Sequence, residues 1–280
     1  DYVIGDVVGK GGFGTVKEGW RLKDDLSVAF KRIEKARVPK WEDKKKTLPK
    51  EIAILERLSL VPNVVHLLGW FEDDISFLLV LERPDPCVDL FDYIQQQGFL
   101  YEPQAKQLFK DAVTIVNDVF EQGVLHLDIK SQNFLVTIDW SGIPSLKLID
   151  FGSADYVSEK PYRRMSGTTL FYPSEWFLLG RFYGLFGTVW SLGVLLFDMT
   201  NGRLPFRSKE DIMSGVFCFQ RSGLTEDLKN LICSLLNPDP CKRLSLDRIL
   251  EHRWFTEERS RSDEDSTGSC QTTSSEELGT

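Results

Sequence analysis

The chain has 280 residues, 42% of them hydrophobic, which is enough to bury the core of one large domain or of two lobes. The net charge of −8 is uneven: from residue 257 onward seven acidic residues face two arginines, a net of −5, which leaves −3 for the rest. Such a mild charge argues against a nucleic-acid partner. No apolar run approaches the roughly 20 residues of a membrane-spanning helix, and the first residues lack a basic start with a long apolar stretch. We therefore expect neither a membrane anchor nor a leader.

The five cysteines are scattered, and no two of them form a C-x-x-C pair. This spacing favours neither a disulfide framework nor a zinc site, and the three separated histidines do not resemble a metal cluster. We expect a reducing intracellular setting, cytoplasmic or also nuclear, and a monomeric chain.

A glycine-rich segment lies between two short β-rich runs, residues 3–8 and 15–20. Glycines allow the backbone to approach a triphosphate and to offer N–H groups to its oxygens, while Val8 and Val16 can pack on a purine. A plain hairpin turn and a dinucleotide fingerprint are the alternatives, and the β-type residues after the glycines disfavour the second. The predicted phosphate flap consists of Val8, Gly9, Lys10, Gly11, Gly12, Phe13, Gly14, Thr15 and Val16.

The next predicted strand, residues 27–33, carries Ala29 and Lys31 on one face. Ala29 is small enough to admit a flat ring, and Lys31 would place its ammonium near the phosphates. The basic residues 35–50 are interpreted as a solvated connection without a function. On the helix expected to follow, Glu51 is the candidate partner of Lys31, and the alternative is an exposed helix carboxylate.

Two more strands, residues 64–71 and 76–81, complete a small antiparallel sheet. The prolines in residues 82–86 cannot continue a sheet, so this stretch is predicted to be a stiff hinge between two lobes. If adenine docks here, the missing N–H of Pro84 removes one hydrogen bond that a hinge could offer. The residues assigned to the adenine side of the nucleotide are Leu81, Glu82 and Pro84.

Beyond residue 89 the periodicity becomes helical. Helices are predicted over residues 90–97, 103–121, 186–200, 225–236 and 246–250. Residues 153–171 lack a clear period and have the length of a mobile loop over an active site, and residues 257–280 are predicted to be a disordered acidic, Ser/Thr-rich tail. The fold class expected is α+β and two-lobed: a small β-rich N-lobe with one main helix (1–81), a hinge, and a larger, mainly α C-lobe (87–256).

Two polar loops follow the long predicted helix, and their side chains match the needs of phosphoryl transfer. That reaction needs a base for the attacking hydroxyl, a cation for the moving phosphoryl group and ligands for magnesium. Asp128 is predicted to be the base, Lys130 the cation, and Asn133 and Asp150 the magnesium ligands. The alternative is a polar loop whose aspartates and asparagine only satisfy turns.

In order and spacing these motifs resemble the set that defines protein kinases. They are Gly9-x-Gly11-x-x-Gly14-x-Val16, Val28-Ala29-Phe30-Lys31, Glu51, His126-x-Asp128-x-x-x-x-Asn133, Asp150-Phe151-Gly152 and Pro173-Ser174-Glu175. The resemblance covers residues 1–256 and implies a kinase domain that binds ATP and Mg²⁺ in a cleft and transfers the γ-phosphate to protein hydroxyls. Within the family the chain looks most like the PIM serine/threonine kinases, through residues 81–86, 89–92, 123–126, 148–153 and 189–193.

Further positions refine what the resemblance implies. Lys130 and Thr168 match serine/threonine rather than tyrosine kinases, so protein serines and threonines are the expected acceptors. Glu175 and Arg243 match the buried ion pair that braces the substrate platform in the family. Leu127 departs from the pattern, because most kinases have an arginine there that binds a phosphorylated residue of the activation loop. Leucine has no donor, so we expect activity that does not depend on phosphorylation of residues 153–171.

The substrate side departs from the PIM pattern as well. PIM-like kinases prefer basic sequences before the target residue and use acidic residues around the cleft. Acids at matching positions are Asp89, Asp92 and Asp198. However, Ser131 and Gln132 stand where Asp-Glu is usual, and Arg203 stands where an acid is expected, so we expect a relaxed or altered preference for basic substrates.

Two functions other than an active protein kinase stay open at this point. One is a nucleotide-binding pseudokinase scaffold, against which the complete set of catalytic residues argues. The other is a small-molecule phosphotransferase, against which the platform at residues 172–175 argues.

Overall fold

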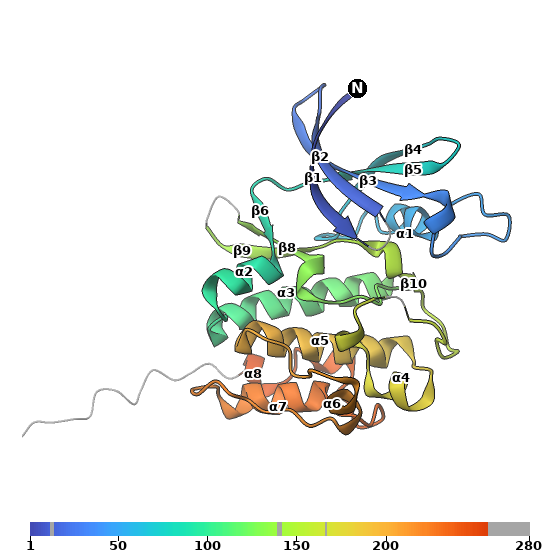
Figure 1. The fold of residues 1–280 in the computed structure, drawn as a ribbon. Helices are drawn as coiled ribbons and strands as arrows, with labels where there is room; N and C mark the ends of the chain where they lie inside the picture. Colours follow the sequence, from blue (N-terminus) through green and yellow to red (C-terminus); the bar gives the residue numbers. More distant parts are fainter. Residues whose placement is uncertain (12–13, 139–141, 166, 257–280) are drawn as a thin grey trace, which may run out of the picture.

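The computed structural model describes residues 1–11, 14–138, 142–165 and 167–256. It folds into two lobes, a β-rich N-lobe and a mainly helical C-lobe (Figure 1), which confirms the predicted α+β architecture. The predicted flap residues Gly12 and Phe13 and the predicted acidic tail lie outside the described residues. Of the described helices, none has both the length and the apolar character needed to cross a bilayer.

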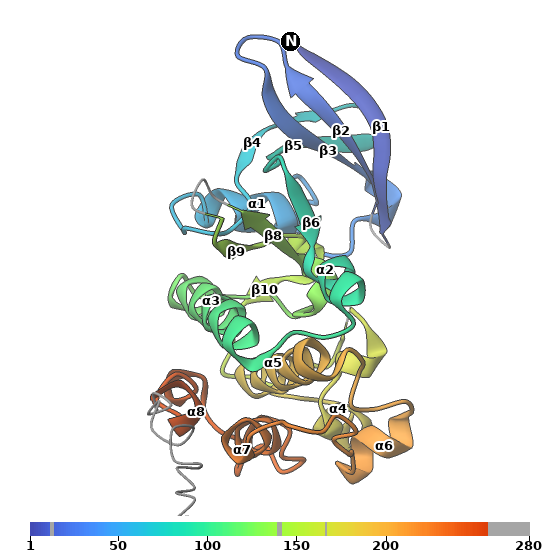
Figure 2. The same cartoon turned by 90° about the vertical axis from the view of Figure 1, so that its left-hand side faces the viewer.

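The N-lobe is a five-stranded antiparallel sheet, in the order β1-β2-β3-β5-β4, with one α-helix. Its elements are β1 (Tyr2–Gly11), β2 (Gly14–Arg21), β3 (Leu26–Glu34), the 3-10 helix η1 (Lys35–Arg37), α1 (Lys50–Arg57), β4 (Leu67–Glu72) and β5 (Ser76–Glu82). Helix α1 lies between the sheet and the C-lobe (Figures 1 and 2). Its apolar residues Ile52, Ile54 and Leu55 are buried, which fixes the direction in which Glu51 points.

The strand register places most of the predicted nucleotide-contacting side chains of the sheet on one face. Val16 is paired with Lys31, and Ala29 with Leu81. Directly opposed residues share a face of the sheet, and so do residues two apart on one strand. Val16, Ala29, Lys31 and Leu81 therefore line the same side, while Val8 near the end of β1 is exposed.

The C-lobe contains seven α-helices among its described residues, with short strands at its upper edge. The helices are α2 (Leu90–Gln97), α3 (Glu102–Glu121), α4 (Ser174–Leu179), α5 (Gly184–Asn201), α6 (Lys209–Ser214), α7 (Glu226–Leu235) and α8 (Arg253–Thr256). The strands are β6 (Cys87–Asp89), β7 (Val124–Leu125), β8 (Phe134–Ile138), β9 (Pro144–Leu148) and β10 (Asp155–Tyr156), and the 3-10 helices are η2 (Ser131–Asn133), η3 (Phe151–Ser153), η4 (Thr169–Phe171) and η5 (Leu246–Arg248). Helix α5 is apolar on nearly all sides and is buried between α3 and α7 (Figure 2).

Specific caps set where the helices of the C-lobe begin and end. The carboxylate of Asp89 accepts a hydrogen bond from the N–H of Asp92 (2.8 Å) and begins α2. Helix α5 ends at Gly202, which has a φ of +68°, and a Cβ there would lie 1.8 Å from the carbonyl oxygen of Gly98. Glycine is thus required at this position, and the ends of α2 and α5 are packed together.

Several predicted boundaries were wrong. The strand expected from residue 64 begins at Leu67, because Val64 forms a parallel bridge with Leu148 and Val65 donates to the carbonyl of Leu148. The helix expected over 246–250 is only a 3-10 turn, η5. Helices α4, α6 and α8 were not predicted, since four to six residues are too few to show a period.

Two segments expected to be irregular are held by specific contacts. Residues 153–171 contain β10, an antiparallel bridge between Tyr162 and Phe182, and η4. Residues 35–50 are not simply solvated, because Trp41 packs edge-to-face on the core residue Phe77, with ring centroids 6.2 Å apart. Both segments therefore have fixed places next to the site described below.

Candidate active site

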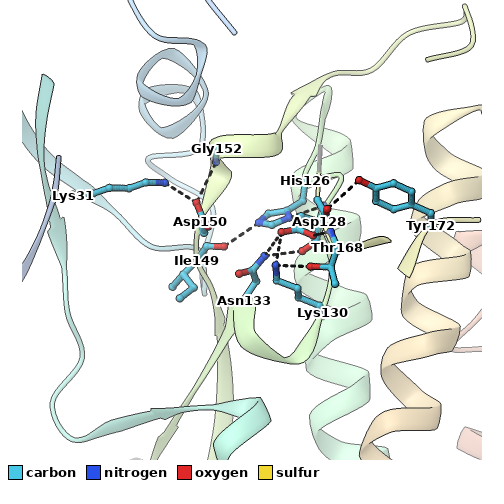
Figure 3. Close-up of polar contacts among 11 residues, drawn as sticks. Lys31, His126, Asp128, Lys130, Asn133, Ile149, Asp150, Gly152, Thr168 and Tyr172 are labelled. Carbon is cyan, nitrogen blue, oxygen red and sulfur yellow. Dashed lines mark hydrogen bonds and ion pairs between the residues drawn. The ribbon is translucent and has the colours of Figure 1, made fainter. Parts of the chain in front are cut away.

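Lys31 joins the two lobes at the centre of the site (Figure 3). It projects from β3, and its Nζ lies 2.6 Å from Oε1 of Glu51 and 2.6 Å from Oδ1 of Asp150. Glu51 comes from α1 and Asp150 from the loop after β9, so one ammonium connects the sheet, the helix and the C-lobe. The predicted pairing of Lys31 with Glu51 is found, and Asp150 faces the same ammonium.

The three charged side chains differ in their exposure to solvent, and this difference decides which of them a bound cation could contact. The side chains of Lys31 and Glu51 are 7% and 5% exposed, whereas that of Asp150 is 36% exposed. Burial alone would lower the pKa of Lys31, but the two carboxylates raise it above its ordinary value. Burial raises the pKa of Glu51, whose Oε2 has no hydrogen-bond partner among the described residues. For Asp150 burial acts in the same direction, but the charge of Lys31 outweighs it and lowers the pKa, so Asp150 is the anionic carboxylate that a cation could reach.

His126 positions the loop that carries Asp128. Its Nδ1 accepts a hydrogen bond from the N–H of Asp128 (3.3 Å), and its Nε2 lies 2.9 Å from the carbonyl oxygen of Ile149. Because a carbonyl only accepts, the ring is the neutral Nε2–H tautomer, and burial lowers the pKa of His126. The ring also packs on Phe151, with centroids 4.8 Å apart, and thus connects the loops of Asp128 and Asp150.

Asn133 and Asp150 offer a donor set that fits magnesium. Nδ2 of Asn133 donates to the backbone oxygen of Asp128 (2.7 Å) and to its Oδ2 (3.1 Å), which leaves Oδ1 as the oxygen able to bind a metal. The carbonyl of Asn133 accepts from the N–H of Ile149 (2.9 Å), the residue before Asp150. An amide oxygen and one carboxylate suit Mg²⁺, which commonly takes its remaining ligands from phosphates and water.

Lys130 and Thr168 hold the Asp128 carboxylate at the outer side of the site. Nζ of Lys130 lies 2.7 Å from Oδ2 of Asp128 and 2.9 Å from the Thr168 hydroxyl (Figure 3). The N–H of Thr168 donates to Oδ1 of Asp128 (3.1 Å), and the Tyr172 hydroxyl donates to the carbonyl of Gly167 (3.0 Å). At Gly167 a Cβ would lie 2.7 Å from Oδ1 of Asp128, so a larger residue would press on this carboxylate.

The described part of the glycine flap shows which of its side chains face Lys31. Strand β1 ends at Gly11, which is paired with Gly14 at the start of β2, and Gly9 is paired with Val16. Thr15 is opposite Arg32 and therefore shares its face of the sheet, away from Lys31. The Thr15 side chain therefore points away from the Lys31 side, and its backbone is the part that could contact a nucleotide there.

The side chain of Glu82 at the hinge makes contacts outside the nucleotide cleft. Its Oε1 lies 2.6 Å from Nζ of Lys147 on β9 and accepts from the N–H of His66 (3.0 Å). The carboxylate thus fastens the end of β5 to the C-lobe and is not available to a nucleotide. Of the other residues assigned to the adenine side, Leu81 faces the Lys31 side, and Pro84 offers no N–H.

Two lysines that the sequence did not single out bind the start of the activation segment, residues 153–171. Nζ of Lys40 donates to the carbonyls of Ser153 (2.9 Å) and Ala154 (3.2 Å) and lies 3.0 Å from the carboxylate of Asp155. Nζ of Lys50 lies 2.8 Å from the same carboxylate. The interpretation of residues 35–50 as a connection without a function is therefore wrong. A lysine-rich segment gives no sign of which lysine will be paired, because the partner is about a hundred residues away.

The predicted platform ion pair is found. Nη1 and Nη2 of Arg243 lie 3.0 and 2.8 Å from the two oxygens of Glu175, a bidentate and fully buried contact. Asp198, expected to attract basic substrates, is buried instead and accepts a hydrogen bond from the Ser131 hydroxyl (2.9 Å). Burial raises the pKa of Asp198. With the residue 3% exposed, its carboxylate is not accessible to a substrate, contrary to expectation. Asp92 on α2 remains exposed.

Comparison with known proteins agrees with this geometry. The sequence model of the protein kinase domain matches residues 2–255. The chain is 38% identical to the serine/threonine-protein kinase pim-2 of Danio rerio, over 91% of this chain and 85% of that protein. It is also 38% identical to prk-2 of Caenorhabditis elegans, over 92% of this chain and 59% of that protein, and 31% identical to calcium-dependent protein kinase 19 of Arabidopsis thaliana, over 91% and 48%.

The fold and the site therefore define a protein kinase, and the chain belongs to the protein kinase family. More narrowly, it is a serine/threonine protein kinase of the PIM-like kind, as the resemblance in its motifs had indicated.

Proposed function

We propose that this kinase is catalytically active and transfers the γ-phosphate of ATP to serine and threonine side chains of proteins, with Mg²⁺ held by Asn133 and Asp150. The observation that carries the proposal is the position of Lys31, 2.6 Å from both Glu51 and Asp150. This contact requires the sheet, α1 and the C-lobe to be assembled around one cleft, which phosphoryl transfer in kinases demands.

Each residue of the site has a separate role in the phosphoryl transfer. Magnesium, when bound, supplies positive charge that neutralises the phosphates. Lys31 holds the phosphate chain, and the N–H groups of the flap glycines face its oxygens. Asp128, fixed by Asn133 and Lys130, accepts the proton of the attacking hydroxyl. Lys130 stabilises the negative charge of the phosphoryl group in transit.

A transfer assay with radiolabelled ATP and magnesium, run beside Asp128→Asn, tests the proposal. The variant keeps the shape of the side chain but loses the base, so the rate should fall about 10²–10⁴-fold while nucleotide binding is retained. Binding of ATP by the wild-type chain without any transfer would favour the alternative, an inactive nucleotide-binding scaffold.

We further propose that activity does not require phosphorylation of the activation segment. Leu127 has no donor for a phosphate, and contacts within the chain already hold both ends of the segment. At its start Lys40 and Lys50 bind Asp155, and near its end Thr168 is bound by Asp128 and Lys130. These contacts support a segment that is ordered without a phosphate.

Phosphatase treatment of the purified enzyme tests this second proposal. We expect the rate to change by less than about threefold, because the Leu127 side chain has no donor that could bind a phosphate of the activation segment. A fall of about tenfold or more would reject the idea. Leu127→Arg is the matched variant, since it restores a donor at that position and should make the rate sensitive to phosphatase.

A further inference from the structure

Three arginines form a basic cluster on the activation segment and the loop after α4. Arg163 follows Tyr162, and Arg181 precedes Phe182; these two aromatic residues form an antiparallel bridge with backbone hydrogen bonds of 2.8 and 3.2 Å. In an antiparallel bridge the residue after one partner and the residue before the other are neighbours. Arg163 and Arg181 therefore lie side by side, and Arg164 is next along the chain.

The backbone that carries this cluster is fixed. The rings of Tyr162 and Phe182 stack with centroids 5.5 Å apart, and the Tyr162 hydroxyl donates to the carbonyl of Tyr156. Gly184 at the start of α5 lies against the same ring, since a Cβ there would be 2.7 Å from it. The backbone that carries the arginines is thus anchored by the Tyr162–Phe182 bridge.

Within the described part of the chain, the guanidinium groups of this cluster have no partner. Arg163, Arg164 and Arg181 are exposed, and no hydrogen bond or ion pair joins their side chains to another described residue. With Lys160 they make four cations against the single exposed acid Glu159, a local net charge of +3. Like charges placed together destabilise the fold, and this patch contrasts with the net charge of −8 of the chain.

Two acids of neighbouring C-lobe segments do not neutralise the patch, because they are engaged elsewhere. Asp155 is bound by two lysines, and Glu175 by Arg243. The patch therefore keeps a positive field that points to solvent. Guanidinium groups bind carboxylates and phosphates through paired hydrogen bonds, so an anion with two or more oxygens is the ligand that suits it.

The cluster lies within reach of a bound acceptor. Gly167 is three positions after Arg164, so their Cα atoms are no more than about 11 Å apart. Gly167 in turn lies against the Asp128 carboxylate, the proposed base. A side chain as long as arginine can therefore contact residues a few positions from the serine or threonine that reacts at Asp128.

We propose that Arg163, Arg164 and Arg181 form a recognition site for acidic or phosphorylated residues next to the acceptor, so that this kinase selects acidic substrates. The proposal rests on the proposed kinase function and names its substrate class. At these positions of the substrate it predicts a preference for acidic residues, in place of the relaxed preference for basic residues expected from the sequence. The exposed acid Asp92 lies on α2, away from β10 and α4 in Figure 1, so a residual preference for basic residues would concern other positions of the substrate.

A peptide array tests the proposal. Each peptide carries one serine acceptor and an alanine background, with glutamate, phosphoserine or arginine placed in turn at each flanking position. We expect glutamate or phosphoserine to raise kcat/KM about tenfold or more at positions on one side of the acceptor, as one or two charge-assisted hydrogen bonds would. In Arg163→Glu/Arg164→Glu this ratio should fall to about one or below, because the attraction becomes repulsion.

Two controls separate the proposal from its rivals. Arg248→Glu reverses an exposed charge on η5 and should leave the acidic preference unchanged. The same array is repeated after phosphatase treatment: an acidic preference that appears only then would mean that the arginines bind a phosphate on the chain itself, and would overturn the substrate proposal. Equal rates for all peptides, or arginine favoured on both sides, would overturn it too.

Binding distinguishes this proposal from the kinase function on which it rests. Fluorescently labelled glutamate and alanine peptides are titrated into Asp128→Asn, which cannot transfer phosphate. Tighter binding of the glutamate peptide, lost in the variant that also carries Arg163→Glu and Arg164→Glu, supports the recognition site even if the wild-type chain proves inactive. Equal affinity for both peptides would overturn it even if the chain proves active.

Discussion

Replacing Arg243 with methionine tests the most deeply buried ion pair of the C-lobe. Its guanidinium binds both oxygens of Glu175, at 3.0 and 2.8 Å, and its side chain is 0% exposed. Methionine keeps part of the volume but has no donor, so the Glu175 carboxylate, 6% exposed, is left buried without its partner. Breaking a buried pair from one side costs about 3–5 kcal/mol. At roughly 2–4 °C per kcal/mol for a domain of about this size, the unfolding midpoint should fall by about 6–20 °C.

Scanning calorimetry measures the midpoint, and Glu175→Gln is the matched control. In that variant Arg243 keeps the carbonyls of Phe186 (2.7 Å) and Asn237 (3.1 Å) as acceptors, so the loss should be smaller than in Arg243→Met. Combining the two changes should cost less than the sum of the single losses, because no charge is then left unpaired. A loss below about 1 kcal/mol in Arg243→Met would mean that the pair behaves as a surface pair and refute the reasoning.

Three further predictions concern the site. Glu51→Gln keeps the shape of the carboxylate but removes one charge from Lys31, so kcat/KM for ATP should fall about 10–100-fold in steady-state kinetics; an unchanged value would mean that Asp150 alone positions the lysine. Asp155→Asn weakens the ion pairs with Lys40 and Lys50 that hold the start of the activation segment. The kcat of the dephosphorylated enzyme should therefore fall about tenfold, with little change in KM for ATP. Finally, because burial lowers the pKa of His126 below 6.5, the unfolded chain binds a proton that the folded chain does not as pH falls below 6.5. Stability should therefore decrease from pH 7 toward pH 5 by at most about 1.4 kcal/mol per pH unit through this group. His126→Gln should lack that part of the decrease, and identical urea-unfolding profiles for both proteins would show that His126 is not responsible.

Residues whose function depends on local spacing could be predicted from the sequence. The two-residue separation of Ala29 and Lys31 sets their common face, and Asp128, Lys130 and Asn133 lie within one short loop, so chain connectivity alone brings them together. The long helix α3 was also predictable, because its 20 residues show the helical period clearly.

Contacts between distant segments could not be predicted in the same way. Nothing in the sequence near Asp198 shows that it is buried against Ser131, 67 positions away. In the same way, Glu82 sits at the hinge, but its carboxylate turns to Lys147 because the C-lobe presents a partly buried ammonium there. In each case a tertiary partner decides which way a side chain points, and the partner is visible only in the fold.

The activation segment uses cations in two different physical ways. At its start Lys40 and Lys50 share the carboxylate of Asp155, and these ion pairs hold the backbone in place. At Arg163 and Arg164 the charges are unpaired among the described residues, so they add no rigidity and keep their attraction for an anion. Because these ion pairs already order the activation segment, Arg163 and Arg164 are not needed to bind a phosphate on that segment. Those arginines are then free to bind the substrate, so the two proposals, independence from phosphorylation and selection of acidic substrates, are physically compatible.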